Sequence, residues 1–162
     1  MSGRKKGGDL TGPNPTDRGN LGTKYHVLTD RDGLPLHIEL SGANRHDSML
    51  VEPVLDNVTA IKGIGRGRPT RRPHKFHADK AYDNRRVRRY LRRRGIPARI
   101  ARIGVESRQR LGKHRWVVER TMAWILGYRK LATRHDRTAT TILAHATLAI
   151  TITCARRLPP PN

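Results

Sequence analysis

The sequence predicts an α/β fold, a mixed sheet with helices packed on it, and three observations support this. Two β-rich runs separated by a turn predict an antiparallel hairpin at residues 24–40. Short strand-like runs then alternate with segments of helical periodicity. The last third of the sequence predicts two helices. A hairpin followed by alternating strands and helices is the pattern of a sheet covered by helices.

The hairpin consists of KYHVLT at 24–29 and LHIEL at 36–40, and Asp32-Gly33 supplies its turn. Alternation places one set of side chains on the same face: Tyr25, Val27 and Thr29. Residues 1–22, rich in Gly, Pro and Asn, predict a flexible basic arm. Residues 23–156 are expected to form one domain.

The middle of the chain predicts a helix, a strand, a second helix and a second strand. Ser48 or Asp47 can cap the first helix, which runs to Val58. HKFHAD at 74–79 predicts a buried strand that ends at Asp79. The arginine-rich segment 84–94 predicts a helix that Gly95 ends, and IPARIARI predicts the next strand. Two helices follow, at 113–128 and 138–154.

The charge balance points to a polyanionic partner. The chain has 34 Lys and Arg against 13 Asp and Glu, a formal net charge of +21. Residues 63–104 alone contribute 15 Lys and Arg and 2 Asp, so they hold +13 of that excess. Such an excess is typical of proteins that neutralise nucleic-acid phosphates. Aromatic residues make up 4%, too few for the interfacial anchors of a membrane-surface protein.

Two carboxylates are candidates for a metal site. Asp79 ends a predicted strand, and Glu119 lies on the following long helix. Carboxylates brought together from a strand and a helix suit Mg²⁺ or Mn²⁺, and such ions support phosphodiester chemistry. A structural alternative stays open for each acid. Asp79 can cap the next helix, and Glu119 can pair with Arg115 or Arg120.

Four stretches, in this order, resemble the DDE transposases of bacterial insertion sequences, in the group named for insertion sequence five. They are GPNPTDRGNLGTKYHVLTDRDGLPL (12–36), SGANRHDS (41–48), HADKAYD (77–83) and RWVVERTMAWILGYRKL (115–131). The resemblance covers nearly the whole chain and implies that residues 23–156 form a partial DDE transposase catalytic domain. It implies a ribonuclease H-like fold that lacks its first strand, which agrees with the α/β order of elements above, and an enzyme that binds double-stranded DNA.

The resemblance assigns roles to individual residues. Asp79 matches the second catalytic acid and Glu119 the third, and Arg115 matches the arginine four residues before that glutamate. The family's tyrosine and lysine around this motif are replaced by Gly112 and Leu126. Arg129 or Lys130 can stand in for the lysine. The full set of expected DNA contacts is Arg115, Lys80, Arg120, Arg129, Lys130, Arg85, Arg88 and Arg92.

The family's first acid and first strand precede the stretch that matches Lys5 to Gly8, and no residue here matches them. Asp9 and Asp17 lie in the arm and are not expected to replace that acid. The chain alone is therefore expected to be catalytically weak, as a truncated copy or as the second frame of a frameshifted gene. In the second case an upstream-frame polypeptide is a partner, and homo-oligomers are common among transposases.

In the complete enzyme, water would attack the phosphodiester at the element's end, and the freed 3′-hydroxyl would then attack target DNA. This activity implies a cytoplasmic, nucleoid-associated protein. Two alternative functions stay open. One is a non-catalytic basic nucleic-acid-binding protein. The other is a metal-dependent nuclease on the same fold, which strand-transfer products would distinguish.

Overall fold

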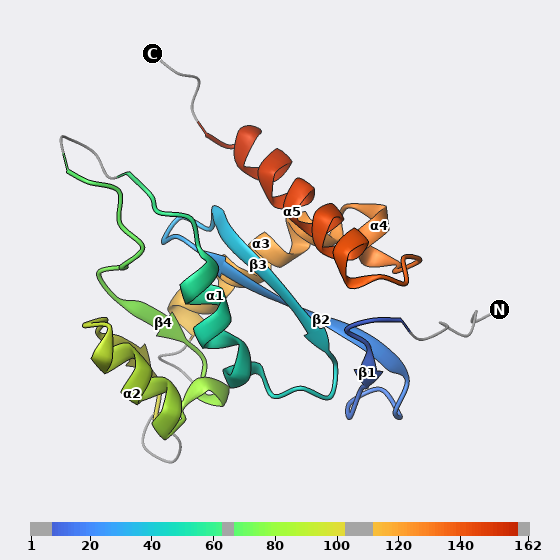
Figure 1. Cartoon of the computed structure of the whole chain (residues 1–162), viewed down its shortest axis with the longest axis horizontal. Coiled ribbons are helices and arrows are strands. Elements are labelled where there is room, and N and C mark those ends of the chain that lie inside the picture. The colour runs from blue at the N-terminus through green and yellow to red at the C-terminus, as the bar shows by residue number, and fades with distance from the viewer. Residues whose placement is uncertain (1–7, 63–66, 103–111, 159–162) are drawn as a thin grey trace. The chain divides into compact units, whose positions relative to one another are not determined.

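The chain is a mixed α/β protein, as predicted. The computed structural model in Figure 1 describes residues 8–62, 67–102 and 112–158, without the side chains of residues 112–115. The chain divides into two compact units. Unit 1 joins residues 1–45 to residues 118–162, and unit 2 is the continuous segment 46–117.

The predicted hairpin is the centre of unit 1. Strands β2 (Leu21–Thr29) and β3 (Pro35–Gly42) are antiparallel, with Tyr25 opposite Leu40. Gly33 lies in the connecting turn with φ of 86°, a conformation that glycine adopts without steric conflict. The two-residue strand β1 (Gly12–Pro13) pairs with the start of β2.

Residues 8–22, within the expected flexible arm, follow a defined path held by contacts to the far end of the chain. The Asp9 backbone N–H donates to the Arg137 carbonyl at 2.8 Å, and its carboxylate accepts from the Ala139 N–H at 3.0 Å. The Arg134 guanidinium donates to the Asp9 carbonyl at 2.5 Å. Sequence periodicity misses this segment because its strand is two residues long. Residues 1–7 lie outside the described residues.

Three helices complete unit 1. They are α3 (Gly112–Leu126), of which residues from 118 onward belong to this unit, then α4 (Arg129–Ala132) and α5 (Ala139–Ala155). Helix α5 begins at the cap Thr138 and lies along β3 (Figure 1). Tyr25 and Val27, which the alternation placed on one face of β2, pack against the buried core of this unit. That core comprises Ile38, Ile125, Leu131, Ala146, Ala149 and Ile150.

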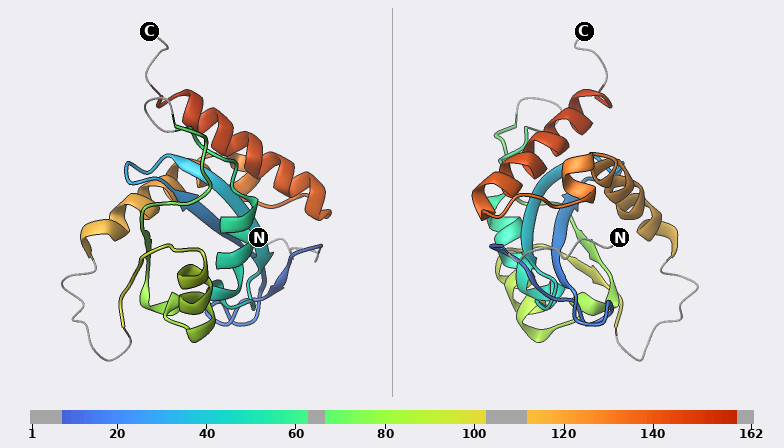
Figure 2. Two further views of the ribbon diagram at one scale, coloured as in Figure 1. Left: turned by 60° about the vertical axis from the view of Figure 1, so that its left-hand side comes forward. Right: turned by 90° about the vertical axis from the view of Figure 1, so that its right-hand side faces the viewer.

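Unit 2 is built on a strand–helix–strand element. Strands β4 (Phe76–Ala78) and β5 (Ala98–Ile100) are parallel, and α2 (Arg85–Arg93) connects them and packs beside β5 (Figure 2). Both strands are shorter than predicted, because only three residues of each pair. The apolar face of α2 is buried, namely Val87, Tyr90 and Leu91. Gly95 follows the helix with φ of 65°, as a terminating glycine should.

The first helical segment of unit 2 corrects one prediction. It begins as a 3-10 turn, η1 (Asp47–Leu50), and continues as α1 (Val51–Asn57). The cap is His46, whose Nδ1 accepts from the Ser48 N–H at 3.3 Å, so neither Ser48 nor Asp47 is the N-cap. The turn starts one residue earlier than expected, which places Asp47 inside it.

Candidate functional site

Asp79 lies at the carboxyl end of β4, where parallel strands commonly present ligand-binding residues. It also caps the 3-10 turn η2 (Lys80–Tyr82), because its Oδ1 accepts from the Ala81 N–H at 2.9 Å. Asp79 can therefore cap η2 and still occupy the position at the end of β4 that was expected for a metal-binding acid. The bond fixes one carboxylate oxygen, and the side chain as a whole is exposed.

Tyr82 lies in the field of two carboxylates. Burial, together with the negative charges of Asp47 and Asp79, raises the pKa of Tyr82 to about 12. The phenol therefore stays protonated at neutral pH and keeps a proton to donate. Sequence patterns did not single out Tyr82, because its environment depends on η1 and η2 lying together.

The second acid of the HADKAYD motif has a structural partner. Asp83 Oδ1 accepts from Arg88 Nε at 2.7 Å, and Arg88 Nη2 also donates to the Ile100 carbonyl at 3.0 Å. Arg88 thereby joins the segment before α2 to strand β5. Its guanidinium is engaged inside unit 2 rather than directed to solvent.

Glu119 lies on an exposed position of α3 in unit 1. The next two residues hold this helix against the hairpin turn. Thr121 Oγ1 donates to the Gly33 carbonyl at 2.6 Å, and Arg120 Nη2 donates to the Asp32 carbonyl at 2.5 Å. The Arg120 guanidinium also lies 4.8 Å from the centre of the Trp124 ring, a cation–π distance.

The two predicted acids thus belong to different units, Asp79 to unit 2 and Glu119 to unit 1. The side chain of Arg115 lies outside the described residues, and so does its expected pairing with Glu119. Among the described residues, no group of three or more His, Cys, Asp or Glu side chains could hold a metal ion.

The cations expected to contact DNA differ in their exposure. Arg129 and Lys130 on α4 are exposed, and so are Arg85 and Arg92 on α2, whereas Lys80 is half-buried in η2. Arg89 and Arg93 are also exposed on α2, although the sequence analysis did not predict them as DNA contacts. Their spacing from Arg85, four and eight residues, was the signal that could have found them.

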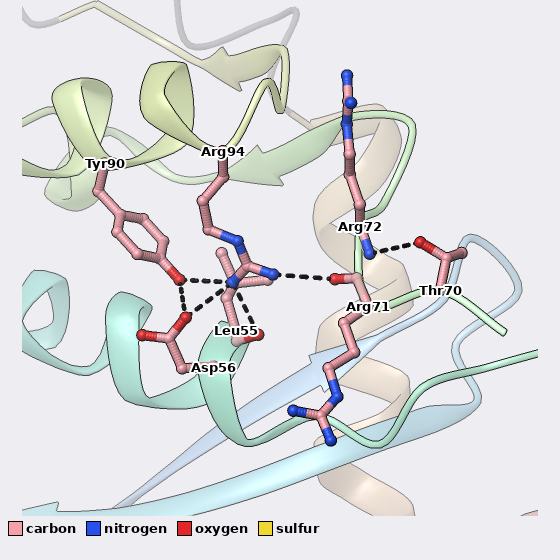
Figure 3. Close-up of polar contacts among 7 residues, drawn as sticks. All are labelled: Leu55, Asp56, Thr70, Arg71, Arg72, Tyr90 and Arg94. Carbon is pink, nitrogen blue, oxygen red and sulfur yellow. Dashed lines mark hydrogen bonds and ion pairs between the residues drawn. The ribbon is translucent and has the colours of Figure 1, made fainter.

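Arg94, at the end of α2, is anchored by several partners (Figure 3). Its Nη1 donates to Asp56 Oδ1 at 2.9 Å and to the Leu55 carbonyl at 3.0 Å. Tyr90 donates to the same Asp56 oxygen at 2.6 Å. The guanidinium also reaches the Arg71 carbonyl at 3.3 Å. These bonds connect α1, α2 and the segment before β4.

In the part of the chain that the structure describes, no helix is both long enough and apolar enough to cross a bilayer.

The family profile described as the transposase DDE domain matches residues 4–154. The chain belongs to this family. It is also 46% identical over 139 residues to a Burkholderia cepacia protein assigned as the transposase for insertion sequence element IS402. That alignment covers 86% of this chain and 65% of the relative, so the chain spans about two thirds of the relative's length. No solved structure matches the chain.

These findings confirm the resemblance to DDE insertion-sequence transposases that the four sequence stretches carried. The family acts on DNA, and its domains typically use divalent metal ions.

Proposed function

We propose that this chain forms part of the catalytic domain of an insertion-sequence transposase in the group named for insertion sequence five. It would cleave double-stranded DNA at the element's ends and join it to target DNA. The observation that supports this most directly is the position of Asp79. Its carboxylate is exposed at the end of β4, within the family's HADKAYD motif, and one oxygen is oriented by the Ala81 N–H.

In this proposal the fold is ribonuclease H-like, and Asp79 and Glu119 are the second and third acids of the triad. Carboxylate oxygens are hard ligands that fit Mg²⁺ or Mn²⁺. Asp79 suits this role because its cap bond fixes the carboxylate while leaving it exposed. A bound divalent ion would supply Lewis-acid stabilisation of charge on the phosphodiester oxygens. Asp79 and Glu119 supply two of the three acids of the triad, and full activity also requires the first acid.

The basic residues of the site have two proposed roles: some hold DNA phosphates, and others fix the helices near the two acids. Arg115 would hold a phosphate near Glu119, and the exposed Arg129 and Lys130 would replace the missing family lysine. Phosphate contacts of this kind fix the register of the duplex without reading its sequence. Arg88 and Arg120 have partners within the protein and so contribute chiefly by fixing α2 and α3. Such an enzyme would work at the nucleoid, as a multimer when two element ends are joined.

Metal binding and DNA binding measured on the full chain test the proposal. Calorimetric titration with Mn²⁺ should detect binding that Asp79→Asn and Glu119→Gln each weaken at least about tenfold, as ligand-shell changes commonly do. Affinity for duplex DNA should persist in both variants. Asp17→Asn, an exposed acid in unit 1, is the matched control and should bind Mn²⁺ normally.

Two outcomes would overturn parts of the proposal. If the wild-type chain binds DNA but shows no response to Mn²⁺ or Mg²⁺, it is a non-catalytic nucleic-acid-binding protein. If the chain alone nicks DNA robustly with Mg²⁺, the requirement for a further acid is wrong. Products of cleavage without strand transfer from the completed enzyme would indicate a nuclease instead.

A further inference from the structure

The seven arginines of α2 and its C-cap divide into two sets. Three are anchored inside unit 2. Arg86 pairs with Glu52 at 2.8 Å and reaches the Ser48 carbonyl at 2.5 Å; Arg88 and Arg94 hold the contacts described above. The other four are exposed and make no side-chain hydrogen bond or ion pair in the described part of the chain. This second set is called the outer stripe: Arg85, Arg89, Arg92 and Arg93.

The outer stripe occupies one face of α2. Residues at positions i, i+4, i+7 and i+8 fall within about 100° of one another on a helix of 3.6 residues per turn. Val87 and Leu91 are buried on the opposite side. With a rise of about 1.5 Å per residue, the stripe extends for about 12 Å along the helix.

Local energetics do not account for four cations in this arrangement. Arg85 and Arg89, like Arg89 and Arg93, are like charges four residues apart, which destabilises a helix. Arg85 is also the first residue of α2, where the helix dipole disfavours a positive charge. Each anchored arginine has a carboxylate partner at Glu52, Asp83 or Asp56. The protein thus neutralises one set internally and leaves the other for an external anion.

The chemistry of the stripe fits a duplex phosphate backbone. Guanidinium groups bind phosphate oxygens in two-point geometry. The stripe contains no aromatic side chain on which unpaired bases could stack, and no apolar group that could enter a membrane interface. About 12 Å corresponds to roughly three to four nucleotides of one strand, at about 3.4 Å per nucleotide.

The strand–helix–strand topology sets the direction of the stripe. Asp79 lies at the carboxyl end of β4, and α2 returns from that end so that β5 can run parallel to β4. Arg85 is therefore at the Asp79 end of α2, and Arg92 and Arg93 are at the other end. We propose that the outer stripe binds the phosphates of duplex DNA that runs away from the Asp79 carboxylate, without reading its sequence.

The choice of DNA as the polyanion rests on the proposed function, whereas the division of the arginines does not. The test replaces Arg85, Arg89, Arg92 and Arg93 with Gln in the full chain. A matched control replaces four exposed arginines of unit 1, Arg31, Arg45, Arg137 and Arg156, and so removes the same charge. Affinity for a duplex of arbitrary sequence is measured between about 50 and 200 mM salt.

The stripe variant should show a slope of log affinity against log salt that is smaller by about 3 to 4, because each lost phosphate contact removes about 0.9. The control slope should change by less than about 1. Circular dichroism should match wild type in both variants, and the thermal midpoint should not fall in either, since the eight side chains are exposed. Equal loss of slope in the two variants would show that only net charge matters and would overturn the proposal.

Two further measurements separate this proposal from the proposed function. Asp79→Asn should lose metal binding while it keeps the stripe-dependent salt slope; a chain without any metal response can still pass this test. Competition with vesicles of phosphatidylglycerol and with single-stranded RNA tests the partner. Stripe-dependent binding to either of these that exceeds binding to duplex DNA would contradict the assignment.

Discussion

Neighbouring residues of the same type have opposite roles in α2. Arg88 is tied to Asp83 and to the Ile100 carbonyl, whereas Arg89 is exposed. Sequence alone could not separate them, because the partners of the anchored arginines come from α1, from β5 and from the turn before α2. Helical spacing groups Arg89 with Arg85 and Arg93, but only the tertiary structure shows that Arg88 is neutralised and that Arg89 is exposed.

Arg88→Gln should therefore lower the free energy of unfolding by about 1–2 kcal/mol, because it leaves the partly buried Asp83 carboxylate without its ion pair. Arg89→Gln, the control, should change it by less than about 0.5 kcal/mol. Urea denaturation followed by circular dichroism measures both. Equal destabilisation by the two substitutions would argue against the anchoring role.

The Tyr82 hydroxyl gives a second prediction at this scale. Its pKa rises from 10.0 to about 12 in the folded chain, so the unfolded chain loses the proton first. The stabilising contribution is complete below pH 10 and is lost as the pH rises towards 12.

Asp47→Asn removes one of the charges that raise this pKa, so Tyr82 should ionise at lower pH. Absorbance of the ionised phenol, with the curve of the Tyr82→Phe variant subtracted, follows the titration. Asp17→Asn should leave it unchanged. A Tyr82 midpoint that does not move in Asp47→Asn would mean that the two groups are not in electrostatic contact.

Among the elements, the strength of the local signal decided what the sequence could predict. The β2–β3 hairpin has clear alternation around Asp32-Gly33, and α2 has an apolar face followed by Gly95, so both were predicted. Strand β1 and helix α4 contain two and four residues, too few for any periodicity. The position of Asp79 after β4 was predicted, whereas the electrostatic contact of Tyr82 with Asp47 required the packing of η1 on η2.

The hairpin turn carries a prediction of its own. Gly33→Ala should destabilise the protein by about 1–2 kcal/mol, because a side chain at φ of 86° meets steric conflict. The turn also supplies the carbonyl that accepts from Thr121, so α3 should lose protection from hydrogen exchange. Gly67→Ala is the control, since a Cβ there meets nothing within 4 Å. Thermal denaturation in which Gly33→Ala matched wild type would contradict the turn's role.

At the scale of the whole molecule, the chain has two separately packed units. Ile125→Ala removes a fully buried side chain from the core of unit 1 and should lower its free energy of unfolding by about 2–5 kcal/mol. Hydrogen exchange should then accelerate in β2 and β3 and stay unchanged in α2. Equal acceleration in α2 would show that the units unfold together rather than as separate cooperative elements.

The bonds from Arg134 and Ala139 to Asp9 also bear on how the protein is made. Unit 2 is continuous in sequence, so all of it can fold soon after it leaves the ribosome. Unit 1 must wait, since α5, which covers β3, is separated from the hairpin by all of unit 2 and is synthesised long after it. At usual rates of translation that interval is roughly 5–20 s. The nascent hairpin therefore exposes its apolar face and its strand edges for seconds, and this is the period in which a chaperone would be most useful.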